Sequence, residues 1–133
     1  MNTVNGKKNF RWVLLRHTFP PEDVEGFHFD LLLEDREFCR TWRLSTIPIL
    51  DGPYVESLYI PPHNLYWLDI EEKVVSGNRG FATRVKKGTV LEPLPLVDKN
   101  FIDLLVKWDD VQVNLVINEN GFRIFRKNIN YFL

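Results

Sequence analysis

Hydrophobic and polar residues alternate along several short stretches of this chain, which is the pattern expected of half-buried β-strands. The clearest stretch is FHFDLLLE, residues 27–34. Successive side chains of a strand point to opposite faces, so His28 and Asp30 share one face, about 7 Å apart at roughly 3.3 Å per residue. The other face is predicted to consist of four apolar side chains, those of Phe27, Phe29, Leu31 and Leu33. One face is therefore expected in the core, while the other presents an imidazole beside a carboxylate.

Other stretches predict further strands. These stretches are 10–17, 38–44, 63–72, 81–90, 111–118 and 122–127. Polar turn residues, Asp35 and Arg36 in one case and residues 119–121 in another, predict hairpins between neighbouring strands. The chain therefore contains many short strands joined by turns, which favours an antiparallel sheet.

The stretch 102–108 is compatible with two structures. Helical spacing relates Phe101, Leu104, Leu105 and Trp108, and Asp98 is placed to cap a helix at its N-terminus. The same letters, IDLLVKW, equally fit a buried strand. We favour the strand, and one short helix remains open.

Four segments are predicted to be irregular. Residues 1–9 are polar and expected to be a loose end, residues 18–26 form a loop rich in proline and acidic residues, and 75–80 have the chemistry of a turn. Residues 45–62 are interrupted by proline and glycine and are expected to make a long irregular excursion. The predicted fold is mainly β, a compact antiparallel β-barrel (or a sandwich) with long loops and at most one or two short helices.

Composition limits the class of protein. A chain of 133 residues is expected to form one domain, 1–133, with its own core. A net charge of −1 gives no global sign of a nucleic-acid partner, so any anion site has to be a local cluster. The single cysteine, Cys39, fits a reducing compartment. Because no stretch is long and apolar enough for a membrane span or a signal peptide, we expect a soluble cytoplasmic protein without membrane contact.

The chain has three histidines, His17, His28 and His63. If the first two strands are neighbours, His17 approaches His28 and Asp30. Two imidazoles and one carboxylate make a set of ligands suited to Mn²⁺, Fe²⁺ or Zn²⁺, with open positions for water or substrate. The alternative is a hydrogen-bonded His28–Asp30 pair at a barrel mouth, with His17 on the surface and His63 in a loop. Spacing alone does not decide between these interpretations.

An ordered set of motifs favours the metal interpretation. RWVLLRH, HFDLLLE, RTWRL and HNLYWLDIEEKVVSGNRGFATRVKKGTV follow one another in the chain. The set resembles the phosphoesterase domain at the N-terminus of bacterial ligase D proteins, the multifunctional end-joining ligases, and the small stand-alone relatives of that domain. The resemblance runs over residues 11–90 and more loosely to 127. It uses all three histidines in order.

The resemblance implies a compact β-barrel that resects DNA 3′ ends with Mn²⁺, removing a terminal ribonucleoside and then the 3′-phosphate. His17, His28 and Asp30 fall on the family's metal ligands, and His63 falls on its second catalytic histidine. We accordingly expect a divalent metal, Mn²⁺ first with Zn²⁺ or another transition metal as alternatives. The expected partner is a nucleic-acid 3′ end, with separate ligase or polymerase proteins possible, and the protein is expected to be a monomer.

The chain departs from the family pattern at its phosphate-binding residues. Two family arginines are replaced here by Leu32 and Val55. The loop between the first two histidines is longer and acidic, and the family tyrosine after the later histidine corresponds to Trp67, with Tyr66 adjacent. The arginines that are candidates to bind phosphate instead are Arg16, Arg40 and Arg43.

Arg40 and Arg43 lie on opposite faces of a regular strand, so at most one of them is expected to reach the site. Three functions remain open. The first is a metal-dependent phosphoesterase. The second is a non-catalytic binding module that keeps the barrel and the metal site. The third is a barrel with a closed structural metal in a repair or RNA-processing complex.

Overall fold

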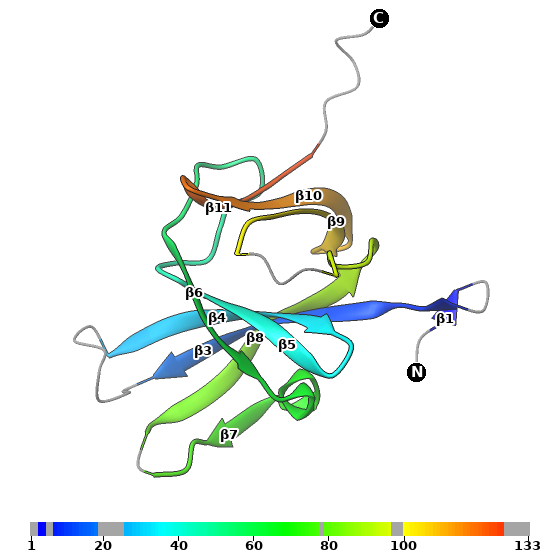
Figure 1. Ribbon diagram of the computed structural model, residues 1–133. Coiled ribbons are helices and arrows are strands. Elements are labelled where there is room, and N and C mark those ends of the chain that lie inside the picture. Colours follow the sequence, from blue (N-terminus) through cyan, green and yellow to red (C-terminus); the bar gives the residue numbers. More distant parts are fainter. Residues whose placement is uncertain (1–2, 5–6, 19–25, 78, 97–99, 127–133) are drawn as a thin grey trace, which may run out of the picture.

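The computed structural model describes residues 3–4, 7–18, 26–77, 79–96 and 100–126, and antiparallel strands make up most of them (Figure 1). The main sheet has the strand order β11-β10-β9-β8-β3-β4-β5-β6, with β7 paired to β8. Its strands are β3 (Phe10–Thr18), β4 (Phe27–Asp35), β5 (Phe38–Leu44), β6 (Ser57–His63), β7 (Glu72–Val74), β8 (Phe81–Val90), β9 (Ile102–Trp108), β10 (Val111–Asn118) and β11 (Gly121–Phe125). A separate two-stranded pair, β1 (Thr3–Val4) and β2 (Lys7–Lys8), lies within the segment expected to be a loose end. The predicted mainly β fold is confirmed.

The sheet curls until its two ends meet. Val55, just before β6, and Phe122 in β11 exchange two backbone hydrogen bonds of 2.8 Å. Gly121 permits this approach, because its φ of 117° suits glycine and a Cβ at this position would lie 2.2 Å from the carbonyl oxygen of Val55. The result is a barrel-like sheet, as the strand pattern predicts.

Two apolar clusters fill the interior. The larger one lies inside the curl and includes Trp12 and Trp108, whose rings stack with centroids 4.1 Å apart. The smaller one lies on the opposite face of the same strands and consists of Val13, Leu15, Leu32, Cys39 and Leu68. Strand β4 is therefore buried on both faces, whereas the alternation predicts only one core face. Of the four apolar residues predicted for that face, Phe29, Leu31 and Leu33 are buried, and Phe27 is partly exposed at the strand's start.

Two segments differ from the sequence predictions. Residues 57–62, expected to be irregular, form strand β6 together with His63. This strand pairs with β5, and the register shifts between Cys39 and Thr41, opposite the Pro61–Pro62 pair. Proline has no N–H for a ladder, and a register shift on an outer strand accommodates it. The single strand expected over residues 63–72 is not formed. His63 ends β6, a 3₁₀ helix, η1 (Leu65–Asp69), follows, and β7 begins at Glu72.

The local sequence explains helix η1. The side chain of Asn64 caps it by accepting a hydrogen bond from the backbone N–H of Tyr66 at 3.0 Å. Leu65 and Leu68 are three residues apart, the period of a 3₁₀ helix, and both pack against the smaller cluster. For residues 102–108 the favoured strand is confirmed as β9. Most of the acidic loop, residues 19–25, and the proposed cap Asp98 lie outside the described residues.

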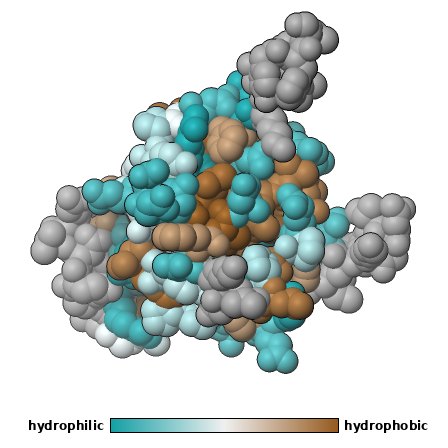
Figure 2. Space-filling view, turned by 45° about the horizontal axis from the view of Figure 1, so that its top comes forward, coloured by the Kyte–Doolittle hydropathy of each residue, from teal (hydrophilic) through white to brown (hydrophobic). Residues whose placement is uncertain are grey.

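Apolar side chains also reach the surface. Figure 2 shows apolar surface interspersed with hydrophilic residues over one face of the molecule. The exposed large hydrophobic residues include Ile49, Leu58, Val74 and Leu96. Among the described residues, no helix is long and apolar enough to cross a membrane.

Candidate functional site

The pairing of β3 with β4 brings the first two histidines together. His17 and His28 are direct partners in this antiparallel ladder, and Asp30 follows two residues later on the same face of β4. Directly opposed residues of an antiparallel pair have Cβ atoms about 4.5–5.5 Å apart. The potential ligand atoms of His17, His28 and Asp30 all lie within 4.8 Å of one another. Register alone thus assembles the set predicted from the sequence.

This donor set fits a divalent transition metal. Two ligands on one ion, each about 2.1 Å from it, lie at most about 4.2 Å apart, so the three side chains need only a small inward movement from the 4.8 Å limit. Two imidazole nitrogens and one carboxylate oxygen suit Mn²⁺, Fe²⁺ or Zn²⁺ and leave positions for other ligands. His28 and Asp30 are buried, which limits competition from bulk water.

The ring of His17 is oriented by a backbone group. Its Nε2 lies 2.8 Å from the carbonyl oxygen of Arg79. A carbonyl only accepts hydrogen bonds, so Nε2 carries the proton and Nδ1 keeps the lone pair. Metal-binding histidines are commonly held in this way by a hydrogen bond from the second ring nitrogen.

Asp30 lies at the centre of the polar contacts. Its carboxylate oxygens are 3.3 Å from Nε of Arg43, 3.5 Å from Nε2 of His28 and 3.8 Å from Nε2 of His63. Burial by itself raises the pKa of Asp30, but the hydrogen bond from His28 and the charges of His28, Arg43 and His63 outweigh it, and the pKa lies below its ordinary value. Asp30 is therefore ionised at neutral pH, as a metal ligand has to be.

His63 approaches the cluster from strand β6. It lies at the end of that strand, and its side chain is 25% exposed. Burial lowers the pKa of His63, and the opposing attraction of Asp30 does not restore it to the ordinary value of 6.5. The imidazole is therefore neutral at pH 7, with one nitrogen able to donate a hydrogen bond and the other able to accept one.

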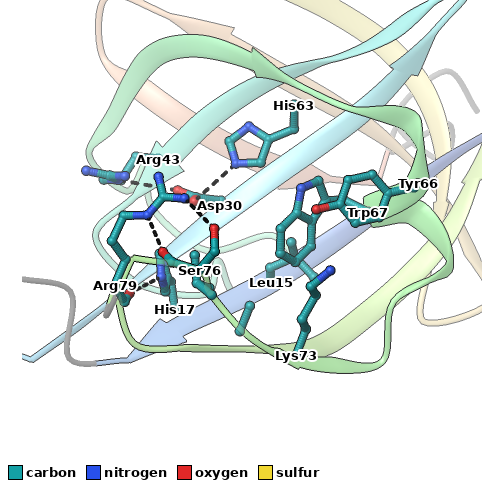
Figure 3. Close-up of a pocket in the computed structure, with 12 residues that line it drawn as sticks. Leu15, His17, Asp30, Arg43, His63, Tyr66, Trp67, Lys73, Ser76 and Arg79 are labelled. Atoms are coloured by element: carbon teal, nitrogen blue, oxygen red, sulfur yellow. Dashed lines mark hydrogen bonds and ion pairs between the residues drawn. The ribbon is translucent and has the colours of Figure 1, made fainter.

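A pocket of 380 Å³ opens over these residues (Figure 3). His17, Asp30, His63 and Arg43 line one part of it. The rings of Tyr66 and Trp67 from helix η1 line another part, together with Lys73 from β7. In Figure 3 the guanidinium groups of Arg43 and Arg79 lie on the Asp30 side, and the two rings lie on the opposite side. The pocket thus combines a polar, cation-rich half with an aromatic half.

No family model matches this chain, and the curated proteins also provide no match. The interpretation of the site accordingly depends on its geometry and on the motifs in the sequence.

The structure separates the three candidate phosphate-binding arginines. Arg43 is the cross-strand partner of Asp30 and lines the pocket. Arg40 is buried on the other face of β5, where its Nε donates to Asp35 at 2.7 Å and its Nη2 donates to the carbonyl of Pro95. The guanidinium of Arg16 lies over the ring of Phe27, 4.7 Å from its centroid, and Arg16 is not among the residues that line the pocket. Of these three, Arg43 alone is placed to contact a ligand there.

Leu32 and Val55, which occupy the positions where the resemblance leads one to expect arginines, both have structural roles. Leu32 is fully buried in the smaller apolar cluster. Val55 forms the bridge to Phe122 that joins the ends of the sheet. Neither of these two residues lines the pocket, so its cationic side chains come from elsewhere.

The sequence analysis missed Arg79 and Lys73. Arg79 lies in the turn before β8, and its guanidinium donates to Ser76, from Nε to the carbonyl at 2.7 Å and from Nη2 to Oγ at 3.1 Å. A guanidinium has five N–H donors, so this contact leaves donors for a ligand. The available signal was an arginine between glycines in the turn SGNRG. Turn chemistry alone does not show that the β7–β8 hairpin folds over the end of β3.

Proposed function

We propose that this protein is a metal-dependent phosphoesterase that processes the 3′ ends of nucleic acids, as the resemblance to the ligase D phosphoesterase domain implies. One observation carries the proposal. Two members of the metal-ligand cluster, His17 and Asp30, line one pocket together with His63 and the guanidinium groups of Arg43 and Arg79, and the third member, His28, is buried next to them. A metal site, a proton-transferring group and anion-binding groups are the three components that phosphate-ester hydrolysis needs.

The three candidate metal ligands and the other residues of the pocket would have different roles in the reaction. His17, His28 and Asp30 would hold the divalent metal, for which Mn²⁺ is the first expectation. When bound, such a metal polarises a phosphate oxygen and lowers the pKa of coordinated water. The Arg79 carbonyl keeps the His17 ring turned so that Nδ1 faces away from that hydrogen bond. Asp30, already ionised, needs no proton removed before it binds.

His63 and Arg43 act on the ester itself. His63 is neutral at pH 7, so its unprotonated ring nitrogen accepts a proton from the attacking water, and the imidazolium so formed donates that proton to the leaving oxygen. Arg43 touches Asp30 through Nε at 3.3 Å, which leaves its terminal nitrogens to bind the non-bridging oxygens. Arg43 and Arg79 together take the part that the family gives to the arginines absent at positions 32 and 55.

The test is an end-trimming assay. Purified protein with Mn²⁺ is incubated with a primer–template that ends in one 3′ ribonucleotide or in a 3′-phosphate. We expect trimming by the native protein and by Asp103→Asn, whose carboxylate is exposed. We expect none by Asp30→Asn or His28→Ala. Equal trimming by all four proteins would show that the cluster does not carry the reaction.

The second candidate function is a binding module that does not turn over its ligand. The apolar residues at positions 32 and 55 favour it, because the family's phosphate clamp is lost there. This function predicts that metal and 3′ ends bind while the ends stay intact at high protein concentration. Turnover that Asp30→Asn abolishes would exclude it.

A further inference from the structure

Helix η1 carries two aromatic rings into the pocket. The rings of Tyr66 and Trp67 stack with centroids 5.0 Å apart and an interplanar angle of 30°, and both residues line the pocket. Tyr66 is 43% exposed. We call this pair the aromatic ledge. Large aromatic rings left accessible in a pocket offer planar surfaces for a ligand.

The ledge is held rigidly. Leu68, on the same short helix, is buried in the smaller apolar cluster, and Asn64 caps the helix. With about three residues per turn, Leu65 and Leu68 face the cluster. Trp67 also packs against this cluster and is partly buried, whereas Tyr66 is exposed. A fixed platform binds a planar ligand without first losing side-chain freedom.

The ledge lies directly beside the metal cluster. Trp67 and His63 meet edge to face with ring centroids 6.5 Å apart, and Nε2 of His63 lies 3.8 Å from Asp30. Lys73 adds a positive charge here, because its Nζ lies 5.0 Å from the Tyr66 centroid and 5.9 Å from the Trp67 centroid. A ligand on the ledge is thus next to both the phosphate-binding groups and a cation (Figure 3).

We propose that the aromatic ledge binds the terminal base of the substrate, so that the site selects base-bearing phosphate ends over sugar phosphates and inorganic phosphate. This inference depends on the proposed function. The polar half of the pocket is sufficient for a phosphate group, but the 380 Å³ volume falls in the range of about 300–1,000 Å³ typical of sites for larger organic ligands. Stacking on aromatic rings tolerates any base, because each base has a π face.

The test separates binding from turnover by using the metal-free protein. Two fluorescent oligonucleotides end in the same 3′-phosphate, but the last nucleotide of one carries a base and that of the other is abasic. We expect the base-bearing end to bind about tenfold more tightly, since stacking of one base contributes about that factor or more. Tyr66→Ala and Trp67→Leu are expected to reduce this preference to near one.

Two further variants serve as controls. Trp67→Phe keeps a ring and is expected to keep most of the preference. Phe101→Ala removes an aromatic residue that is 48% exposed and is not among those lining the pocket, and the preference is expected to be unchanged. If Trp67→Leu does not fold, Tyr66→Ala decides alone because that ring is well exposed.

The results that would contradict base binding at the aromatic ledge differ from those that would contradict the proposed phosphoesterase function. Equal affinity for the two ends, or a preference that survives both ledge variants, would overturn the base subsite even if Mn²⁺-dependent trimming occurs. Base-dependent binding without trimming would overturn the phosphoesterase and leave the subsite standing. Absence of binding to either end, together with absence of Mn²⁺-dependent trimming, would overturn both.

Discussion

His17 and His28 face each other directly across the β3–β4 ladder, with ring centroids 5.0 Å apart and ring planes at 77°. A shift of register by one residue would turn one of them to the other side of the sheet. Phe29, Leu31 and Leu33 on the opposite face of β4 prevent that shift, because it would move all three out of the larger cluster. The geometry of the candidate metal site is therefore fixed by the core.

Metal binding is expected to stabilise the fold. A ligand that binds the native state alone adds about 2.7 kcal/mol to the free energy of unfolding at 100 times its Kd. We predict that Mn²⁺ or Zn²⁺ raises the melting temperature of the native protein, and that His28→Ala and Asp30→Asn abolish the rise. Thermal melts with and without metal measure this. An equal rise in Asp30→Asn and in the surface control Asp103→Asn would place the metal elsewhere.

Alanine substitutions of Arg43 and Arg40 are expected to affect different properties, activity in the first case and stability in the second. The Arg43 side chain is 32% exposed in the pocket, so Arg43→Ala should lower kcat/KM about a hundredfold, the typical loss when one transition-state contact is removed. The same change should alter the free energy of unfolding by under about 1 kcal/mol. Kinetics and urea unfolding on the same preparation test both halves.

Arg40→Ala is expected to lower the free energy of unfolding and to leave the activity of the folded protein unchanged. Arg40 and Asp35 form a buried ion pair, and removal of one partner of such a pair costs about 3–5 kcal/mol of stability. The folded fraction should keep its specific activity, because Arg40 lies on the other face of β5. A large loss of activity in folded Arg40→Ala would contradict its structural assignment.

The substitution Leu32→Arg is expected to unfold the protein and not to improve phosphate binding. Leu32 is fully buried against the smaller cluster, and an unpaired charge there costs more than about 3 kcal/mol. Val74→Arg, at an exposed position, is the matched control and should leave stability nearly unchanged. Urea unfolding measures both. A stable Leu32→Arg with tighter phosphate binding would show that the pocket reaches further than described.

Cys39 is expected to make stability fall at alkaline pH. Burial raises the pKa of its thiol from 9.0 to about 12, with the nearby charge of Glu34 adding to the effect. Between these values the unfolded chain releases a proton that the native protein retains, so stability present below pH 9 declines as the pH rises towards 12. Unfolding curves at pH 7 and 10 should differ less in Cys39→Ala than in the native protein. An identical pH dependence in both would contradict the prediction.

Much of the strand pattern could be read from local sequence. The alternation in residues 27–34 and the hairpin letters at 119–121 concern neighbours in the chain, so the local pattern predicts β4 and the β10–β11 turn correctly. The strand prediction was wrong where two local sequence signals favoured different structures. The apolar residues of 63–72 fit a strand, but the Asn64 cap and the Leu65–Leu68 spacing, supported by the smaller cluster, produce a 3₁₀ helix.

The sequence by itself also named the residues of the candidate metal cluster, because a strand places His28 and Asp30 on one face wherever that strand lies. Only the tertiary structure decided that Arg43 enters the pocket, that Arg40 is buried with Asp35, and that Arg79 and the aromatic ledge reach the site. These placements depend on register, on the curl of the sheet and on the β7–β8 hairpin. All three are set by contacts between residues far apart in the chain, for which a local pattern has no signal.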